Sequence, residues 1–212
     1  MIDPLGGPAF WWPYILGFVI SYLIGAIPFG LILTRLSGAG DLRAIGSGNI
    51  GATNVLRTGR KSLALATLLL DALKGGIPVW LGGQYFGPDM AIIAGLGAVL
   101  GHCFPIWLWF KGGKGVATAA GVVLVLTPLS GVLILFLFAA VVAASRYVSL
   151  GSILAAIAAA PIAYILGHVQ AAELYAAIAL VVLLKHHTNI RRLLAGNESK
   201  VALKSPSSSD NV

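Results

Sequence analysis

Long apolar stretches separated by short polar segments run through this 212-residue chain and limit what it can fold into. Only 10% of its residues are charged, against about 25% in a soluble domain. A helix needs about 20 apolar residues to cross a bilayer, so the pattern predicts an all-α, polytopic membrane protein. The expected membrane spans are 10–33, 62–81, 90–109, 116–126, 129–144, 148–167 and 171–185. We expect a single transmembrane domain over residues 1–204, followed by a disordered polar tail at 205–212.

The segment Val116–Ala144 can form one long helix or two short helices broken at Thr127–Pro128. Proline cannot donate a backbone hydrogen bond, but membrane helices tolerate it, so this residue alone does not decide. The positive-inside rule gives the stronger argument. With two helices, 13 of the 14 basic residues lie on one side, and the exception, Lys74, lies inside a span. We therefore predict seven transmembrane helices, with the N-terminus outside and the C-terminus in the cytoplasm.

The formal net charge of +7 fits this arrangement without a nucleic-acid partner. Cytoplasmic loops rich in lysine and arginine orient the helices and meet anionic lipid headgroups. We expect a multi-pass protein of the cell (inner) membrane, with membrane lipid as a partner and its functional site facing the cytoplasm.

The first polar stretch, Gly46–Asn54, matches G-x-G-x-x-G. A dinucleotide site needs a strand before this pattern, and none is expected, so we reject that interpretation. A flexible loop is the simpler alternative. However, glycines allow close approach to the backbone, Ser47, Asn49 and Asn54 offer hydrogen bonds, and Arg57 can grip a phosphate with two donors. We predict that Asn49, Asn54 and Arg57 bind substrate.

The second polar stretch, Phe110–Thr118, begins Phe-Lys-Gly-Gly-Lys-Gly and precedes an expected span. It is not a Walker A motif, but its glycines let backbone N–H groups form a concavity, with two lysines and a helix N-terminus beside it. A basic interfacial anchor is the alternative, yet an anchor does not need three glycines. The predicted phosphate-binding residues are Lys111, Gly112, Gly113, Lys114, Gly115 and Thr118.

The third polar stretch, His186–Glu198, follows the last span. His186, Asn189 and Arg192 are three residues apart and share one helix face, whereas His187 points elsewhere and is given no role. This face can position a hydroxyl and a phosphate, and a histidine can take a proton near neutral pH. Headgroup contact for Arg192 and interfacial packing for His186 are the alternatives. We predict that Arg192 and Glu198 bind substrate.

Several chemically capable residues lie within the expected spans. Asp71 and Lys74 share a helix face mid-span, which favours a buried ion pair. His102 and Cys103 are adjacent and so do not face each other, which argues against thiol catalysis. We expect His102 to brace the end of its helix and Cys103 to be an apolar filler. The sequence has no metal-ligand cluster, and we expect neither metal nor cofactor.

Three motifs, taken together in this order, carry a family resemblance. They are Gly46-Ser-Gly-Asn-Ile-Gly-Ala-Thr-Asn54 with Arg57, Gly101-His with Phe110-Lys-Gly-Gly-Lys-Gly-Val-Ala-Thr118, and His186-x-x-Asn189 with Arg192 and Glu198. The chain resembles the bacterial membrane glycerol-3-phosphate acyltransferase family, PlsY. The resemblance implies transfer of an acyl group from acyl phosphate to the sn-1 hydroxyl of glycerol 3-phosphate, giving lysophosphatidic acid.

We expect direct transfer, in which Ser47, His186 and Asn189 act as catalytic residues by placing the attacking hydroxyl and stabilising the oxyanion. The expected partners are acyl phosphate, glycerol 3-phosphate and a soluble enzyme that produces acyl phosphate. The main alternative is a membrane transporter for an organic phosphate, although transporters usually place their site near the midplane between repeated halves. A lipid-binding scaffold is a further alternative, but it does not explain the glycines.

Overall fold

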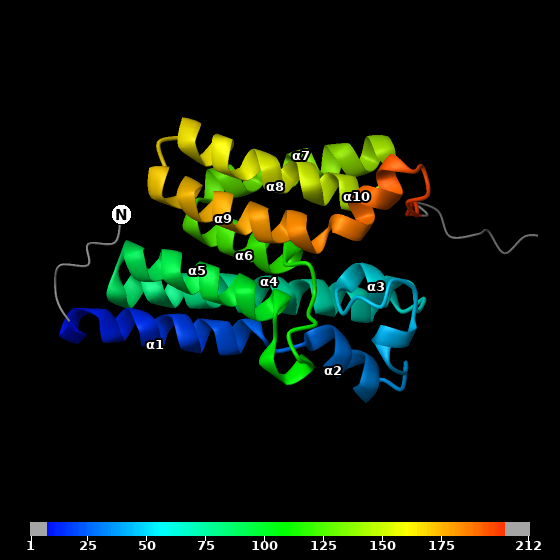
Figure 1. Ribbon diagram of the computed structural model, residues 1–212, viewed down its shortest axis with the longest axis horizontal. Helices are drawn as coiled ribbons and strands as arrows, with labels where there is room; N and C mark the ends of the chain where they lie inside the picture. The colour runs from blue at the N-terminus through cyan, green and yellow to red at the C-terminus, as the bar shows by residue number, and fades with distance from the viewer. Residues whose placement is uncertain (1–7, 202–212) are drawn as a thin grey trace, which may run out of the picture.

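The computed structural model describes residues 8–201 (Figure 1). Within this range it consists of helices and loops and has no strand, which confirms the all-α prediction. The predicted tail at 205–212 lies outside the described residues. The α-helices are α1 (Pro8–Gly25), α2 (Phe29–Leu36), α3 (Ala52–Leu56), α4 (Lys61–Phe86), α5 (Pro88–Cys103), α6 (Val116–Leu126), α7 (Pro128–Ser145), α8 (Val148–Ile165), α9 (Val169–Lys185) and α10 (His187–Leu194), and two 3₁₀ turns are η2 (Leu42–Ala44) and η3 (Ile106–Leu108).

By length and composition, five described segments can cross a membrane: Trp11–Leu36, α4, Pro88–Leu108, α7 and α8. A sixth is present if α9 and α10, which meet at a bend of 63°, count as one broken span. The 11 residues of α6 rise only about 16 Å, about half the thickness of the hydrocarbon core. The described helices therefore support a multi-pass protein, while the number seven stays a prediction.

Two helix breaks define where the chain changes direction. The predicted break at Thr127–Pro128 is confirmed, because α6 ends at Leu126 and Pro128 begins α7. The first expected span, 10–33, is interrupted between α1 and α2, with Pro28 just before the first residue of α2. Proline disfavours helix at the residue before it and donates no hydrogen bond, which accounts for the interruption.

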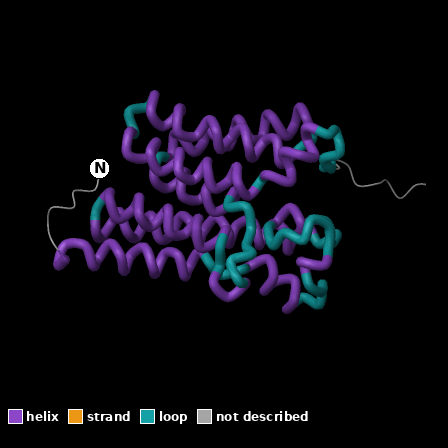
Figure 2. Tube along the Cα trace, in the orientation of Figure 1, coloured by secondary structure: helices purple, strands orange, loops and turns teal. Residues whose placement is uncertain are grey.

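The helices pack as a bundle whose polar connections gather at one end. α4 packs against α5 and α6, α7 and α9 pack against α8, and α5 contacts α1 and α9. The short helices α2, α3 and α10 lie at the end of the bundle opposite the start of α1 (Figure 1). The long loops lie at that same end (Figure 2). The three polar stretches of the sequence thus meet at one end of the molecule.

Close packing of α4 against α6 fixes the start of α6. A Cβ added at Gly75 of α4 would clash with the Thr118 carbonyl, and one added at Gly121 of α6 would clash with the Ala72 carbonyl. Small residues let membrane helices approach closely when no water drives their association. This contact holds the N-terminus of α6 rigidly against α4.

The predicted ion pair inside α4 is confirmed. Lys74 Nζ lies 2.6 Å from Asp71 Oδ1, and both side chains are buried. Lys74 Nζ also donates to the Ile27 carbonyl at 2.8 Å, and this carbonyl belongs to the interruption between α1 and α2. His102 Nδ1 lies 3.7 Å from Asp71 Oδ1, and the neighbouring Cys103 is fully buried. Charges buried in a membrane are usually paired, as Asp71 and Lys74 are here. Lys74 also gives a hydrogen-bond donor to a backbone carbonyl that the helix interruption leaves without a helical partner.

Candidate active site

The first polar stretch is organised by one buried amide side chain. Asn54 Oδ1 accepts a hydrogen bond from the Ser47 backbone N–H at 3.1 Å. Its Nδ2 lies 2.8–3.0 Å from three carbonyl oxygens, those of Leu42, Ile45 and Asn49. Gly46 and Gly48 have positive φ values of 54° and 67°, which glycine adopts without strain. Asn54 therefore holds the shape of the loop that carries Ser47.

The second polar stretch is fixed through its own backbone. The Gly112 N–H donates to the Cys103 carbonyl at 3.2 Å, and the Gly113 N–H donates to the His102 carbonyl at 3.0 Å. A Cβ on Gly112 would clash with the His102 carbonyl, and one on Gly113 with the His102 ring. The following residues turn at Gly115, whose φ is 84°, into the first turn of α6.

The third polar stretch contains a buried histidine with a defined tautomer. His186 lies between α9 and α10 and is 2% exposed. Its Nδ1 lies 2.8 Å from the Val182 carbonyl oxygen. Because a carbonyl only accepts, Nδ1 carries the hydrogen and Nε2 keeps its lone pair. His186 can therefore accept a proton or a hydrogen bond through Nε2.

Glu198 ties the third stretch together. Its Oε1 accepts from Asn189 Nδ2 at 2.6 Å and from Ser149 Oγ at 2.8 Å, and its Oε2 accepts from Arg192 Nε at 2.6 Å. Burial raises the pKa of this carboxyl. The hydrogen bonds from Arg192, Asn189 and Ser149 lower the pKa by more than burial raises it, so the net shift is downward. Glu198 is therefore ionised near neutral pH and orients Asn189 and Arg192.

Lys114 links the second stretch to the third. Its Nζ donates to Asn189 Oδ1 at 2.6 Å, so the Asn189 amide is held on both sides, by Lys114 and by Glu198. Burial lowers the pKa of Lys114 to about 8; Glu198 opposes this shift, and Arg192 and Arg57 add to it. Lys114 is mostly protonated at neutral pH and lies near two other cations. A bound anion would reduce the repulsion between these charges.

These stretches enclose one end of a cavity of about 740 Å³ that is polar at one end and apolar at the other. Its polar lining includes Ser47, Asn49, Asn54, Arg57, Lys114, His186, Asn189, Arg192 and Glu198. Its apolar lining comes from α6 to α9 and includes Val123, Ile134, Phe138, Ala155, Ala159, Tyr175, Ile178 and Val182. A molecule with an anionic head and a hydrocarbon tail fits both parts at once.

A second cavity of about 330 Å³ adjoins the polar end. It shares Ser47, Asn49, Lys114 and Arg192 with the first cavity. Its remaining lining is formed by Gly48, Phe110, Lys111, Gly112, Lys185, His187 and Thr188. Lys111, Lys114, Lys185 and Arg192 supply positive charge to this wall, so the smaller cavity suits a compact anion.

Most of the predicted site residues meet here, but two do not reach either cavity. Ser47, Asn49, Asn54, Arg57, Lys111, Gly112, Lys114, Gly115, His186, Asn189, Arg192 and Glu198 all line one of the two. Gly113 packs under His102 instead. Thr118, predicted to bind substrate, is fully buried and faces α4, because each helical residue turns by about 100° and Thr118 falls on the opposite side from the cavity.

Residues outside the predicted set also contribute to the site, among them Ser149, Lys185 and His187. Ser149 bonds Glu198 from 49 positions away, and no local pattern marks it. Lys185 lines the smaller cavity, and its position at the end of a span beside His186 could have suggested it. His187, which was given no role, lines the smaller cavity as well.

The family described as glycerol-3-phosphate acyltransferase matches residues 15–196 of this chain. The chain belongs to this family. The acyltransferase is 53% identical over 194 residues to the glycerol-3-phosphate acyltransferase of Methylorubrum populi, covering 91% of this chain and 96% of the relative. It is also 53% identical over 190 residues to that of Mesorhizobium japonicum, covering 90% and 97%.

Two solved structures share its fold. The crystal structure of PlsY, described as an integral membrane glycerol 3-phosphate acyltransferase in its glycerol 3-phosphate form, superposes with a TM-score of 0.85 at 38% identity over 90% of this chain and 96% of that one. A lysophosphatidic acid form of PlsY gives a TM-score of 0.84 at 37% identity, with the same coverage. The protein is therefore a multi-pass membrane acyltransferase, and the transporter alternative is set aside.

Proposed function

We propose that this acyltransferase moves an acyl group from acyl phosphate to the sn-1 hydroxyl of glycerol 3-phosphate. The products are lysophosphatidic acid and inorganic phosphate. The observation that carries the proposal is the larger cavity, whose lining is cationic at one end and apolar at the other. Acyl phosphate has the same division, with a charged head and a long hydrocarbon tail.

The acyl phosphate headgroup is assigned to the polar end of the larger cavity. Lys114 and Arg57 supply positive charge there, and Gly115 and Val116 place the N-terminus of α6 in the same wall. Unpaired N–H groups at a helix N-terminus favour a phosphate. The tail then follows the apolar lining between α6, α7, α8 and α9.

Glycerol 3-phosphate is assigned to the smaller cavity, which lies beside the first. Lys111 is found only in this lining, whereas Arg192 and Lys114 line both cavities and stand between the two phosphates. Arg192 can grip a phosphate with two donors. Ser47 also lines both cavities, so it stands where the acceptor hydroxyl must approach the acyl carbon.

The reaction needs one C–O bond formed and one broken. The sn-1 oxygen attacks the acyl carbonyl carbon, and the bond from that carbon to the phosphate oxygen breaks, releasing phosphate. Ser47 and Asn189 orient the acceptor and stabilise the developing oxyanion, with Asn189 held in place by Lys114 and Glu198. The hydroxyl proton passes either to His186 Nε2 or to a substrate phosphate, and phosphate is already a good leaving group.

We propose the same topology that the charges predict: seven crossings, the N-terminus outside, and the site facing the cytoplasm from the inner membrane. The gathering of Arg57, Lys111, Lys114 and Arg192 at one end of the bundle supports this arrangement, because cytoplasmic loops collect basic residues. A cytoplasmic site also meets water-soluble glycerol 3-phosphate, and a soluble enzyme that makes acyl phosphate can deliver it there.

A donor comparison with purified protein tests the proposed function. The detergent-solubilised enzyme is given labelled glycerol 3-phosphate with either palmitoyl phosphate or palmitoyl-CoA. We expect labelled lysophosphatidic acid with acyl phosphate and little with acyl-CoA. A clear preference for acyl-CoA would contradict the assignment of the donor.

Two pairs of variants test the assigned residues in the same assay. Arg192→Ala should lose activity, while the control Arg191→Ala, an exposed neighbour that lines neither cavity, should not. His186→Ala tests the proton acceptor. If its turnover stays within about tenfold of the original enzyme, a change of about 1.4 kcal/mol in barrier height, a substrate phosphate takes the proton instead.

A further inference from the structure

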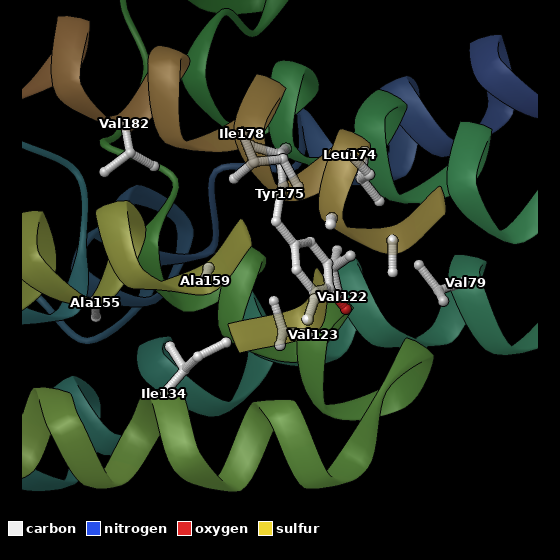
Figure 3. Close-up of a cluster of buried hydrophobic side chains, with 14 of the residues drawn as sticks. Val79, Val122, Val123, Ile134, Ala155, Ala159, Leu174, Tyr175, Ile178 and Val182 are labelled. Atoms are coloured by element: carbon white, nitrogen blue, oxygen red, sulfur yellow. The ribbon is translucent and has the colours of Figure 1, made fainter. Parts of the chain in front are cut away.

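An aromatic side chain lies at the apolar end of the larger cavity. Figure 3 shows Tyr175 reaching from α9 toward Val122 and Val123 of α6, with Ala159 of α8 and Ile134 of α7 around it. Tyr175 lines the cavity but is only 1% exposed. Of the α9 residues in the cavity wall, it lies farthest along the helix from His186. The ring therefore stands at the bottom of the apolar end.

The Tyr175 ring is anchored at its polar tip. Its Oη lies 2.7 Å from Thr127 Oγ1, and Thr127 is the single residue between α6 and α7. Both hydroxyls are buried, and each gives the other the hydrogen bond that a buried polar group needs. A buried ring held at Cβ by α9 and at Oη by the α6–α7 break has little freedom to swing aside.

The depth of the cavity corresponds to one leaflet of a bilayer. Tyr175 precedes His186 by 11 residues, which is about 16 Å along a helix. The hydrocarbon core of a bilayer is about 30 Å thick, so one leaflet and its acyl chains occupy about 15 Å. An acyl chain whose carbonyl lies near His186 and which follows α9 would bring its methyl end to Tyr175.

The walls above Tyr175 are made of small side chains. Ala155, Ala156 and Ala159 of α8 and Gly131 of α7 all line the cavity. Small residues in membrane bundles often let helices contact each other closely. Here they line a cavity instead, and larger side chains at these positions would fill the space between the helices. Small side chains therefore line the wall between the polar end of the cavity and Tyr175.

We propose that Tyr175 sets the longest acyl chain that the enzyme uses efficiently, by meeting the methyl end of the chain. This inference rests on the proposed function, because it assigns the tail of acyl phosphate to this cavity. It makes Tyr175 a specificity-determining residue, with Thr127 as the residue that positions its ring.

The experiment measures kcat/KM for acyl phosphates of increasing length, from lauroyl through palmitoyl and stearoyl to arachidoyl phosphate. For the original enzyme we expect kcat/KM to rise with chain length and then fall at the longest donors. Tyr175→Ala should raise the ratio of arachidoyl to palmitoyl kcat/KM by about tenfold, since one methylene in a hydrophobic pocket is worth at least that much. Tyr175→Phe keeps the ring but loses the hydrogen bond to Thr127, so its limit should lie between those of the original enzyme and Tyr175→Ala.

Two filling variants test the same inference in the opposite direction, in case Tyr175→Ala does not fold. Ala159→Leu should move the preferred donor to a shorter chain, and Ala155→Leu, one turn closer to the polar end, should move it further. The matched control is Tyr164→Ala, because Tyr164 of α8 is 64% exposed and lines neither cavity. It should leave the chain-length profile unchanged.

The outcomes separate this inference from the proposed function. If the original enzyme turns over acyl phosphate but neither Tyr175→Ala nor the two filling variants change the chain-length profile, the tail leaves the cavity sideways into the lipid and the inference is wrong. If the original enzyme uses only acyl-CoA, the proposed function is wrong. A shift to longer donors with Tyr175→Ala together with a shift to shorter donors with Ala159→Leu and Ala155→Leu supports both. If the two leucine variants shift the profile but a folded Tyr175→Ala does not, the tail occupies the cavity and the role of Tyr175 is wrong.

Discussion

The two glycine-bearing loops of the site look alike in sequence but are held by different means. The loop Gly46–Asn54 is built around a side chain, since the Asn54 amide bonds four backbone groups of the surrounding segment. The loop at Lys111–Gly115 is built on backbone contacts, with Gly112 and Gly113 donating to carbonyls at the end of α5. Gly48 of the first loop supplies a backbone conformation, whereas Gly112 and Gly113 of the second supply space.

This difference teaches that a glycine-rich motif does not have one physical explanation. Gly46 and Gly48 have positive φ, so any other residue there is strained whatever the available volume. Gly112 and Gly113 have ordinary φ but no room for a Cβ. Substitutions that separate conformation from volume should therefore affect the two loops in different ways.

The largest effect is expected from Asn54→Ala, which removes the organising side chain of the first loop. Three carbonyls, one buried and two partly buried, and one N–H lose their partner, and each unsatisfied buried group costs about 1–3 kcal/mol. We expect the free energy of unfolding to fall by about 3 kcal/mol or more and activity to be lost. Thermal unfolding in detergent and the acyl phosphate assay measure this. Asn197→Ala, at an exposed asparagine outside both cavities, is the control and should change neither.

The second effect is expected from Gly113→Ala, which adds volume where the second loop has none. Overpacking costs about 1–3 kcal/mol, and displacing Lys114 should lower kcat/KM by about tenfold or more. The added Cβ meets the His102 ring. The double variant Gly113→Ala with His102→Ala should therefore lose less stability and activity than the sum of the losses in the two single variants. Strictly additive losses would show that Gly113 is needed for another reason.

A smaller effect is expected from Gly48→Ala in the first loop. Its φ is 67°, and a left-handed conformation costs an L-residue about 1–2 kcal/mol. Asparagine tolerates this conformation better than alanine, so Gly48→Asn should be the milder change although its side chain is larger. Thermal unfolding of both variants tests the order. If the larger side chain is the more damaging, space and not conformation limits this loop too.

The smallest effect is a pH dependence in the second loop. The pKa of Lys114 is lowered to about 8, so the cation is present below this pH and is lost as pH rises through it. We expect kcat/KM for acyl phosphate, which reports the free enzyme, to be about twofold lower at pH 8 than its plateau, and to keep falling above it. Lys114→Arg stays charged and should flatten this fall. An unchanged profile in that variant would assign the titration to another group.

Local patterns in the sequence predicted the parts of the molecule that depend on nearby residues. The helix break at Pro128 and the pairing of Asp71 with Lys74 follow from proline chemistry and helical spacing, and the structure confirms both. The meeting of most of the site residues followed from placing three polar loops on one side of the bilayer. Charge and apolar runs carry this information directly.

Contacts between distant helices could not be predicted in this way. Tyr175 meets Thr127 across 48 positions, and Ser149 meets Glu198 across 49, and neither pair leaves a periodic signal. The stretch Phe110–Thr118 predicts a binding role for Thr118, but helix rotation turns this residue toward α4. The apolar end of the cavity is formed by four helices together, so no single stretch of the sequence predicts it.

The burial of Cys103 has a practical consequence for all of these measurements. It is the one cysteine of the chain, it is fully enclosed at the end of α5, and its carbonyl is bonded to the second glycine loop. A fluorogenic maleimide would find no thiol on the native enzyme and would react as the bundle opens. The protein thus carries an internal reporter of its own unfolding, placed directly beneath the loop whose variants it would monitor.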